Sequence, residues 1–89
     1  MKIRLIKETE RGREYQTKDF KIIYRYKNTI SGDNSINPKE IVYLVAGSAE
    51  ITIKNKKWKI EAPEKIEIPN KTYHKIKALT DICFILFKK

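Results

Sequence analysis

Strict alternation of apolar and polar residues, broken at short intervals by turn formers, is the feature that most limits how this chain can fold. In the segment FKIIYRYK (20–27), Phe20, Ile22 and Tyr24 occupy every second position, as in a strand with one buried face. Further strand-like segments lie at residues 2–5, 40–46, 49–54, 58–61, 65–68, 73–79 and 82–87. No window keeps a helical period. Short strands spaced by ~8–12 residues predict an all-β sandwich or barrel.

Glycine, proline and polar residues separate these strands. The polar segment ETERGREYQTK (8–18) is predicted to be a loop, and residues 28–39 a longer irregular segment. The pair Gly47-Ser48 suits a tight turn with positive φ at the glycine. Pro63 and Pro69 each end a strand, because proline has no backbone N–H to donate to a neighbouring strand.

A length of 89 residues fits one domain with a modest core. We expect that domain to span residues 1–89, with an N-terminal strand and loop at 1–19 and a barrel core at 20–87. The terminal run ICFILF is apolar on both faces, and a strand of that kind would aggregate if it were left uncovered. We therefore expect a homodimer that forms through apolar strands including Ile82–Phe87.

The net charge of +9 attracts anions such as nucleic acid and phosphorylated metabolites. The basic residues are spread over every segment, so the excess also fits the lysine-rich composition of heat-adapted organisms. The N-terminal residues become charged too early for a signal peptide, and no apolar run approaches the ~20 residues of a membrane span. Cys83 is the one cysteine and has no partner for an internal disulfide. These features predict a cytoplasmic protein.

Two short patterns resemble those of the cupin superfamily. Glu40 and Gly47, in EIVYLVAG, have the separation of the glutamate and glycine in the first cupin pattern. Pro69 and His74, in IPNKTYH, hold the outer places of the second pattern. The resemblance covers about residues 20–87. It implies a small single-domain cupin of the RmlC-like type, a jelly roll or double-stranded β-helix barrel.

The chain departs from the family where the metal ligands would be. Cupins of the metal-binding type hold a transition metal with three histidines and a glutamate. Depending on the register, the paired-histidine places here fall on Asn34 and Ile36 or on Asp33 and Ser35, and Lys71 stands in the place of a glycine. Of the four cupin metal ligands, only Glu40 and His74 remain.

One imidazole and one carboxylate fall short of the three or four protein ligands of a zinc site. Asn34 or Asp33 could add an oxygen ligand, but magnesium and calcium require more converging carboxylates. We therefore expect no metal cofactor, with Glu40 and His74 as the weak metal candidates.

Glu40 and His74 each start an alternating strand, and the resemblance implies that both point into the barrel. There they could bind a ligand together with Asn34 and Tyr24, or act as acid and base, with Tyr24 as the acid. The alternative is structural: Glu40 is then a solvated residue at a strand start, and His74 caps a turn.

Three functions follow, from different classes. The first is a binding module that holds a small anionic or sugar-like ligand and does no chemistry. The second is an enzyme, either an isomerase or epimerase that uses His74 and Glu40, or a weakly metal-dependent sugar isomerase or oxygenase. The third is a protein that binds single-stranded nucleic acid, for which the sequence lacks a block of basic and aromatic residues. The sequence favours the binding module.

Overall fold

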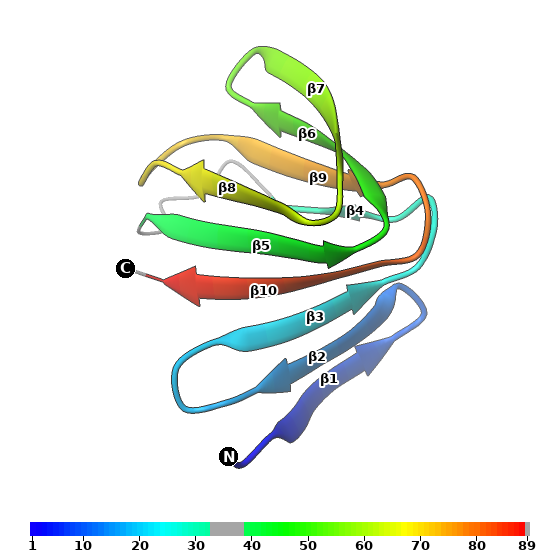
Figure 1. The fold of residues 1–89 in the computed structure, drawn as a ribbon, viewed down its shortest axis with the longest axis vertical. Coiled ribbons are helices and arrows are strands. Elements are labelled where there is room, and N and C mark those ends of the chain that lie inside the picture. The colour runs from blue at the N-terminus through cyan, green and yellow to red at the C-terminus, as the bar shows by residue number, and fades with distance from the viewer. Residues whose placement is uncertain (33–38, 89) are drawn as a thin grey trace.

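The computed structural model describes residues 1–32 and 39–88, and in them the chain forms antiparallel β-strands and no helix (Figure 1). The strands are β1 (Arg4–Thr9), β2 (Gly12–Gln16), β3 (Lys21–Arg25), β4 (Ile30–Ser31), β5 (Glu40–Ala46), β6 (Ser48–Ile53), β7 (Lys56–Glu61), β8 (Glu64–Ile68), β9 (His74–Ala78) and β10 (Ile82–Lys88). The prediction of an all-β chain is confirmed. Over the same residues, no helix is long and apolar enough to cross a membrane.

The strands form two sheets that face each other (Figure 1). The first sheet has six strands in the order β1-β2-β3-β10-β5-β8, and the second has four in the order β4-β9-β6-β7. From β3 onward most consecutive strands, such as β8 and β9, lie in different sheets, so the chain crosses repeatedly between the layers. This arrangement is a small jelly roll.

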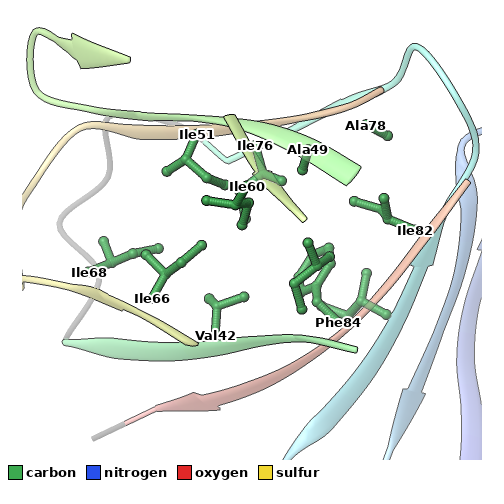
Figure 2. Packing of buried hydrophobic residues seen from close by; sticks show 12 residues of the cluster. Val42, Ala49, Ile51, Ile60, Ile66, Ile68, Ile76, Ala78, Ile82 and Phe84 are labelled. Carbon is green, nitrogen blue, oxygen red and sulfur yellow. The ribbon is translucent and has the colours of Figure 1, made fainter. Parts of the chain in front are cut away.

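Apolar side chains from both layers pack against one another between the sheets (Figure 2). The buried hydrophobic residues are Ile23, Val42, Leu44, Ala49, Ile51, Ile60, Ile66, Ile68, Ile76, Ala78, Ile82 and Phe84. They occupy every second position of β5, β6, β8, β9 and β10, because successive side chains of a strand point to opposite faces. Period two in the sequence therefore predicts the buried face of β6, β8 and β9 correctly, whereas β5 and β10 are apolar on both faces.

The prediction of a loop at residues 8–18 is wrong. Strands β1 and β2 form a hairpin, and β2 pairs along its whole length with β3. Strand β1 overlaps the predicted strand at residues 2–5 and continues to Thr9, and because all six of its residues are exposed, no apolar alternation marks its second half. The N-terminal segment extends the six-stranded sheet beyond the four-stranded one (Figure 1).

The predicted inner face of β3 is also wrong. Ile23 and Arg25 are buried between the sheets, whereas Tyr24 is 38% exposed on the outer face. The sequence misleads here because both faces of β3 carry apolar residues. The outer face of the six-stranded sheet has its own aromatic contacts, including an edge-to-face pair of Tyr15 and Tyr24 with centroids 5.9 Å apart.

Gly47 makes the turn between β5 and β6 with φ 88°, as the sequence predicts. A side chain here would clash with the carbonyl oxygen of Asp81, so the turn requires glycine on two counts. Lys71, in the place where the cupin pattern has glycine, adopts φ 52°. The left-handed backbone is thus present at Lys71 without the residue that favours it.

Candidate functional site

Glu40 and His74 meet in the space between the two sheets. Glu40 begins β5 in the six-stranded sheet, and His74 begins β9 in the four-stranded sheet. The Nε2 atom of His74 lies 3.5 Å from Oε1 of Glu40, and the two residues are 6% and 5% exposed. The solvated position considered for Glu40 is therefore wrong, and the expected pairing of the two residues is present.

The two ring contacts of His74 are both favourable when a proton lies between His74 and Glu40. His74 Nδ1 lies 3.2 Å from the carbonyl oxygen of Thr72, and a carbonyl can only accept, so Nδ1 carries a hydrogen in this contact. With Nδ1 protonated, Nε2 of a neutral ring and an ionised carboxylate would both present lone pairs to each other. One further proton, on Nε2 or on Glu40, makes the contact favourable.

A second ionic pair, which the sequence did not predict, lies in the same space. Arg25 donates from Nη2 to Oε2 of Glu14 at 2.7 Å, and the two side chains are 9% and 14% exposed. Burial raises the pKa of Glu14, but the hydrogen bond and charge of Arg25, then the charges of Lys21 and Lys7, outweigh it and hold the pKa below its ordinary value of 4.5.

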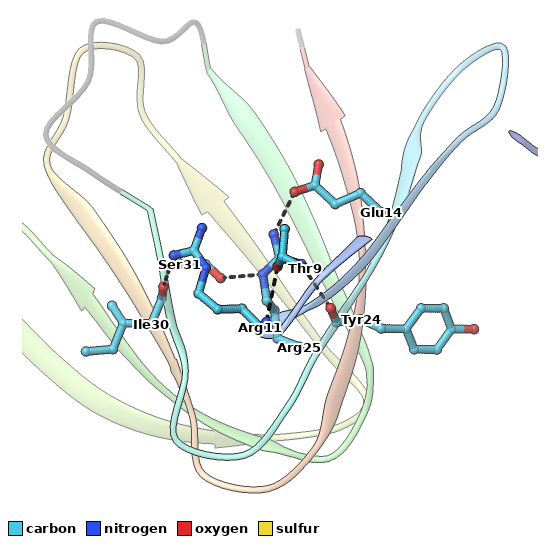
Figure 3. Close-up of polar contacts among 7 residues, drawn as sticks. All are labelled: Thr9, Arg11, Glu14, Tyr24, Arg25, Ile30 and Ser31. Atoms are coloured by element: carbon cyan, nitrogen blue, oxygen red, sulfur yellow. Dashed lines mark hydrogen bonds and ion pairs between the residues drawn. The ribbon is translucent and has the colours of Figure 1, made fainter. Parts of the chain in front are cut away.

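The guanidinium of Arg25 is fixed by further contacts (Figure 3). Its Nε donates to Oγ of Ser31 at 3.0 Å, and its Nη1 donates to the carbonyl oxygen of Tyr24 at 2.9 Å. Arg11 reaches from the turn between β1 and β2 to the carbonyl oxygen of Ile30, with Nη1 at 3.4 Å. The two arginines link the N-terminal hairpin to β4.

Both ionic pairs line one pocket of about 310 Å³. Its polar lining comes from Lys7, Arg11, Glu14, Lys21, Arg25, Ser31, Glu40 and His74. Its apolar lining comes from Ile23, Val42, Ile68, Ile76, Phe84 and Leu86. A volume of this size corresponds to about ten water molecules at ~30 Å³ each, which is enough for one small metabolite.

The structure separates Tyr24 from this pocket. Its ring points away from Arg25 on the outer side of the sheet (Figure 3), where it lies beside Cys83 on β10. The expected partnership of Tyr24 with His74 and Glu40 is therefore wrong. Asn34, together with Asp33, Ser35 and Ile36, lies outside the described residues.

The sequence contains one feature that could have revealed the Arg25 site: β3 carries charged residues on the same face as an apolar residue. Lys21 and Arg25 flank Ile23 at every second position of β3, and buried charges in a core-facing row are rare without a partner. Glu14, the partner of Arg25, is 11 positions away in sequence. Only the pairing of β2 with β3 brings the two together.

The donor set does not suit a tightly held transition metal. Over residues 1–32 and 39–88, no cluster of three or more His, Cys, Asp or Glu side chains converges. His74 and Glu40 supply one nitrogen and one carboxylate, and the other ring nitrogen of His74 is used by Thr72. A catalytic zinc site generally has three protein ligands.

The backbone matches solved structures closely. A cupin superfamily protein from Desulfitobacterium hafniense has a TM-score of 0.73 at 10% identity, over 97% of this chain and 73% of that protein. The chain has the cupin fold. KdgF from Halomonas sp. matches with a TM-score of 0.74 at 16% identity, over 94% of this chain and 85% of that one. The expected jelly-roll architecture is confirmed.

Other matches to the cupin fold of this chain are parts of longer proteins. CapF from Staphylococcus aureus, a capsular polysaccharide assembling protein, gives a TM-score of 0.79 at 14% identity over 98% of this chain but 28% of its own. The salicylate 1,2-dioxygenase of Pseudaminobacter salicylatoxidans gives 0.73 at 12% identity, and the match spans a fifth of its length. Neither a family model nor a curated protein matches the sequence.

Proposed function

We propose that this chain is a binding protein that holds a small anionic or sugar-like ligand between its two sheets and does no chemistry on it. The observation that carries the proposal is a pocket lined by the Arg25–Glu14 ion pair and by the buried contact between His74 and Glu40. Ion pairs of this kind add little net stability compared with apolar residues of similar volume. Their presence in a chain with a small core is better accounted for by recognition of a polar ligand.

An enzyme is the alternative, and one observation favours it. The proton held between His74 and Glu40 could be given to a bound substrate, as an isomerase or epimerase requires. Such an enzyme also needs a second acid or base on the other side of the substrate. Tyr24, the candidate for that role, lies on the outer face of β3. A weakly metal-dependent sugar isomerase or oxygenase would need more ligands than the described residues bring together.

Binding to single-stranded nucleic acid has less support. The outer face of the four-stranded sheet carries Lys57, Lys59 and Lys77, but Glu50 lies among them in the strand register. The positive charge on this face is therefore interrupted, whereas a groove that tracks phosphates is continuous.

A cytoplasmic location also remains part of the proposal, supported by a single cysteine that has no disulfide partner.

A thermal-shift screen tests the proposed function. Neutral sugars, sugar acids, sugar phosphates and nucleotides would each be added to the purified chain. A ligand present at about 100 times its Kd stabilises the folded state by ~2.7 kcal/mol, which for a domain of this size raises Tm by about 10 °C or more. Equal Tm values with all four classes would argue against a small-molecule ligand.

A matched pair of variants locates the binding. Glu40→Gln replaces a pocket carboxylate, which accepts strong hydrogen bonds from ligand hydroxyl groups, by a weaker acceptor and should reduce the Tm shift of a hydroxylated ligand. Lys65→Gln changes an exposed charge on β8 and should leave the shift unchanged. Turnover of a bound sugar by the wild type, lost in His74→Gln, would support the enzyme instead.

A further inference from the structure

One end of the pocket, which we call the cationic end, is formed by Lys7, Arg11, Lys21 and Arg25. Residues opposite one another on paired antiparallel strands point to the same face of the sheet. Lys7 is opposite Glu14, and Glu14 is opposite the buried Ile23. Strands β1 and β3, together with the turn between β1 and β2, thus bring positive charge to the inner surface where β2 places Glu14.

The charges at this end are only partly balanced. Glu14 pairs with Arg25 at 2.7 Å. Within residues 1–32 and 39–88, no carboxylate lies within 4.0 Å of the charged nitrogens of Lys7, Arg11 or Lys21. Glu40, the other carboxylate of the pocket, lies against His74. The cationic end therefore has a positive surplus before any ligand binds.

Arg25 also keeps hydrogen-bond capacity in a fixed orientation. A guanidinium has five N–H donors, and Arg25 uses one on each nitrogen, toward Ser31, Tyr24 and Glu14. One N–H on Nη1 and one on Nη2 have no acceptor among the described residues. Because the group is already held by three partners, little ordering is needed when an oxyanion binds.

We propose that the cationic end binds the carboxylate or phosphate group of a small organic anion, while hydroxyl groups of the same molecule reach His74 and Glu40. This inference rests on the proposed function and names its ligand class. Polar groups at both ends of a pocket of about 310 Å³ match a sugar acid or a sugar phosphate better than an apolar anion. Both ligand classes carry a negatively charged oxyanion, which is a carboxylate in the sugar acid and a phosphate in the sugar phosphate.

Three probes that share one carbon skeleton test this ligand class: glucose, gluconate and glucose 6-phosphate. Their affinities would be measured by NMR titration at constant ionic strength, because salt screens charge interactions over a Debye length of about 10 Å at 0.1 M. We expect gluconate, glucose 6-phosphate or both to bind at least about tenfold more tightly than glucose. The comparison of the two anions tells whether the carboxylate or the phosphate is preferred.

A double variant links that preference to the cationic end. Lys7→Gln with Lys21→Gln should reduce the affinity for the preferred anion by about tenfold or more and leave that for glucose unchanged. The matched control is Lys57→Gln with Lys59→Gln, on the outer face of the four-stranded sheet, which should alter neither affinity. Unchanged Tm values for both double variants would show that folding is intact.

Two results overturn the inference. If glucose binds as tightly as the anions, the ligand class is wrong while the proposed function stands. If wild-type protein binds none of the three probes at about 10 mM, the inference also fails, and the wider thermal-shift screen then decides the proposed function by itself.

Discussion

Glu14 ties the stability of the fold to pH. Burial raises the pKa of Glu14, but Arg25, and then Lys21 and Lys7, lower it by more than burial raises it. The folded-state pKa therefore lies below 4.5. A depressed pKa gives stabilisation that is present above the unfolded-state value and is lost as the pH falls through the folded-state value. We expect the free energy of unfolding to fall below about pH 4.5, as measured by urea denaturation at a series of pH values.

The variant Glu14→Gln should isolate this contribution. It should cost about 1–3 kcal/mol at pH 7, because Arg25 loses its buried charged partner, and it should flatten part of the acid dependence. Glu64→Gln, at an exposed position of β8, should change stability by less than about 0.5 kcal/mol. A Glu14→Gln curve that follows the wild type at all pH values would contradict the role of the pair.

The proton between His74 and Glu40 is open to direct observation. Imidazole ¹⁵N NMR of the wild type should find Nδ1 protonated, since it faces the carbonyl of Thr72. In Glu40→Gln the side-chain amide can donate to Nε2, so we expect Nε2 to carry no hydrogen in this variant while Nδ1 keeps one. A wild-type spectrum with an unprotonated Nδ1 would contradict this assignment.

At the scale of elements, the turn before β9 has a left-handed backbone conformation that favours glycine. Lys71 has φ 52°, which costs a non-glycine residue about 1–2 kcal/mol, partly offset by the greater freedom that glycine has in the unfolded chain. Lys71→Gly should therefore stabilise the chain by about 0.5–1 kcal/mol and raise Tm by a few degrees, as followed by thermal unfolding.

A lysine-to-glycine exchange within a strand should change the free energy of unfolding in the opposite direction. Lys65→Gly, in the middle of β8, should destabilise by about 0.5–1 kcal/mol, since the strand backbone needs no positive φ. A loss of stability in Lys71→Gly would mean that the conformation at this turn is not limited by the side chain.

Strands whose inner face packs in the core were predictable from the sequence, and the pocket was predictable only in part. In β9 the residues after His74 alternate, so its buried face followed from the pattern, whereas β5 is apolar on both faces and the inward direction of Glu40 was implied only by the resemblance to cupins. Hairpin β1–β2 was missed because an exposed edge needs no apolar period. The Arg25–Glu14 pair was missed because it depends on strand register, which composition does not specify.

The molecule as a whole has two unlike outer surfaces. The outer face of the six-stranded sheet is apolar around β10, where Phe87 packs 5.2 Å from Phe20 and 5.7 Å from Tyr43 between ring centroids. The outer face of the four-stranded sheet is charged, with Lys57 3.9 Å from Glu50. An apolar face without acidic or basic groups at its centre suits a second copy of itself.

We therefore keep the homodimer as a prediction and place it on the outer face of β10. Light scattering coupled to gel filtration should give twice the chain mass for the wild type. Ile85→Glu, at the centre of this face, should give a monomer, whereas Thr52→Glu, on the charged face, should leave the dimer intact. A wild type that elutes as a monomer would contradict the prediction.

The N-terminal hairpin contributes Lys7, Arg11 and Glu14 to the pocket and not one residue to the buried aliphatic cluster. Mutations in this segment can therefore alter what the chain selects without opening a void in its interior. Part of the ligand preference is thus encoded in a segment that adds nothing to the buried cluster. Related proteins could therefore differ in ligand through substitutions in this hairpin while they keep the same fold.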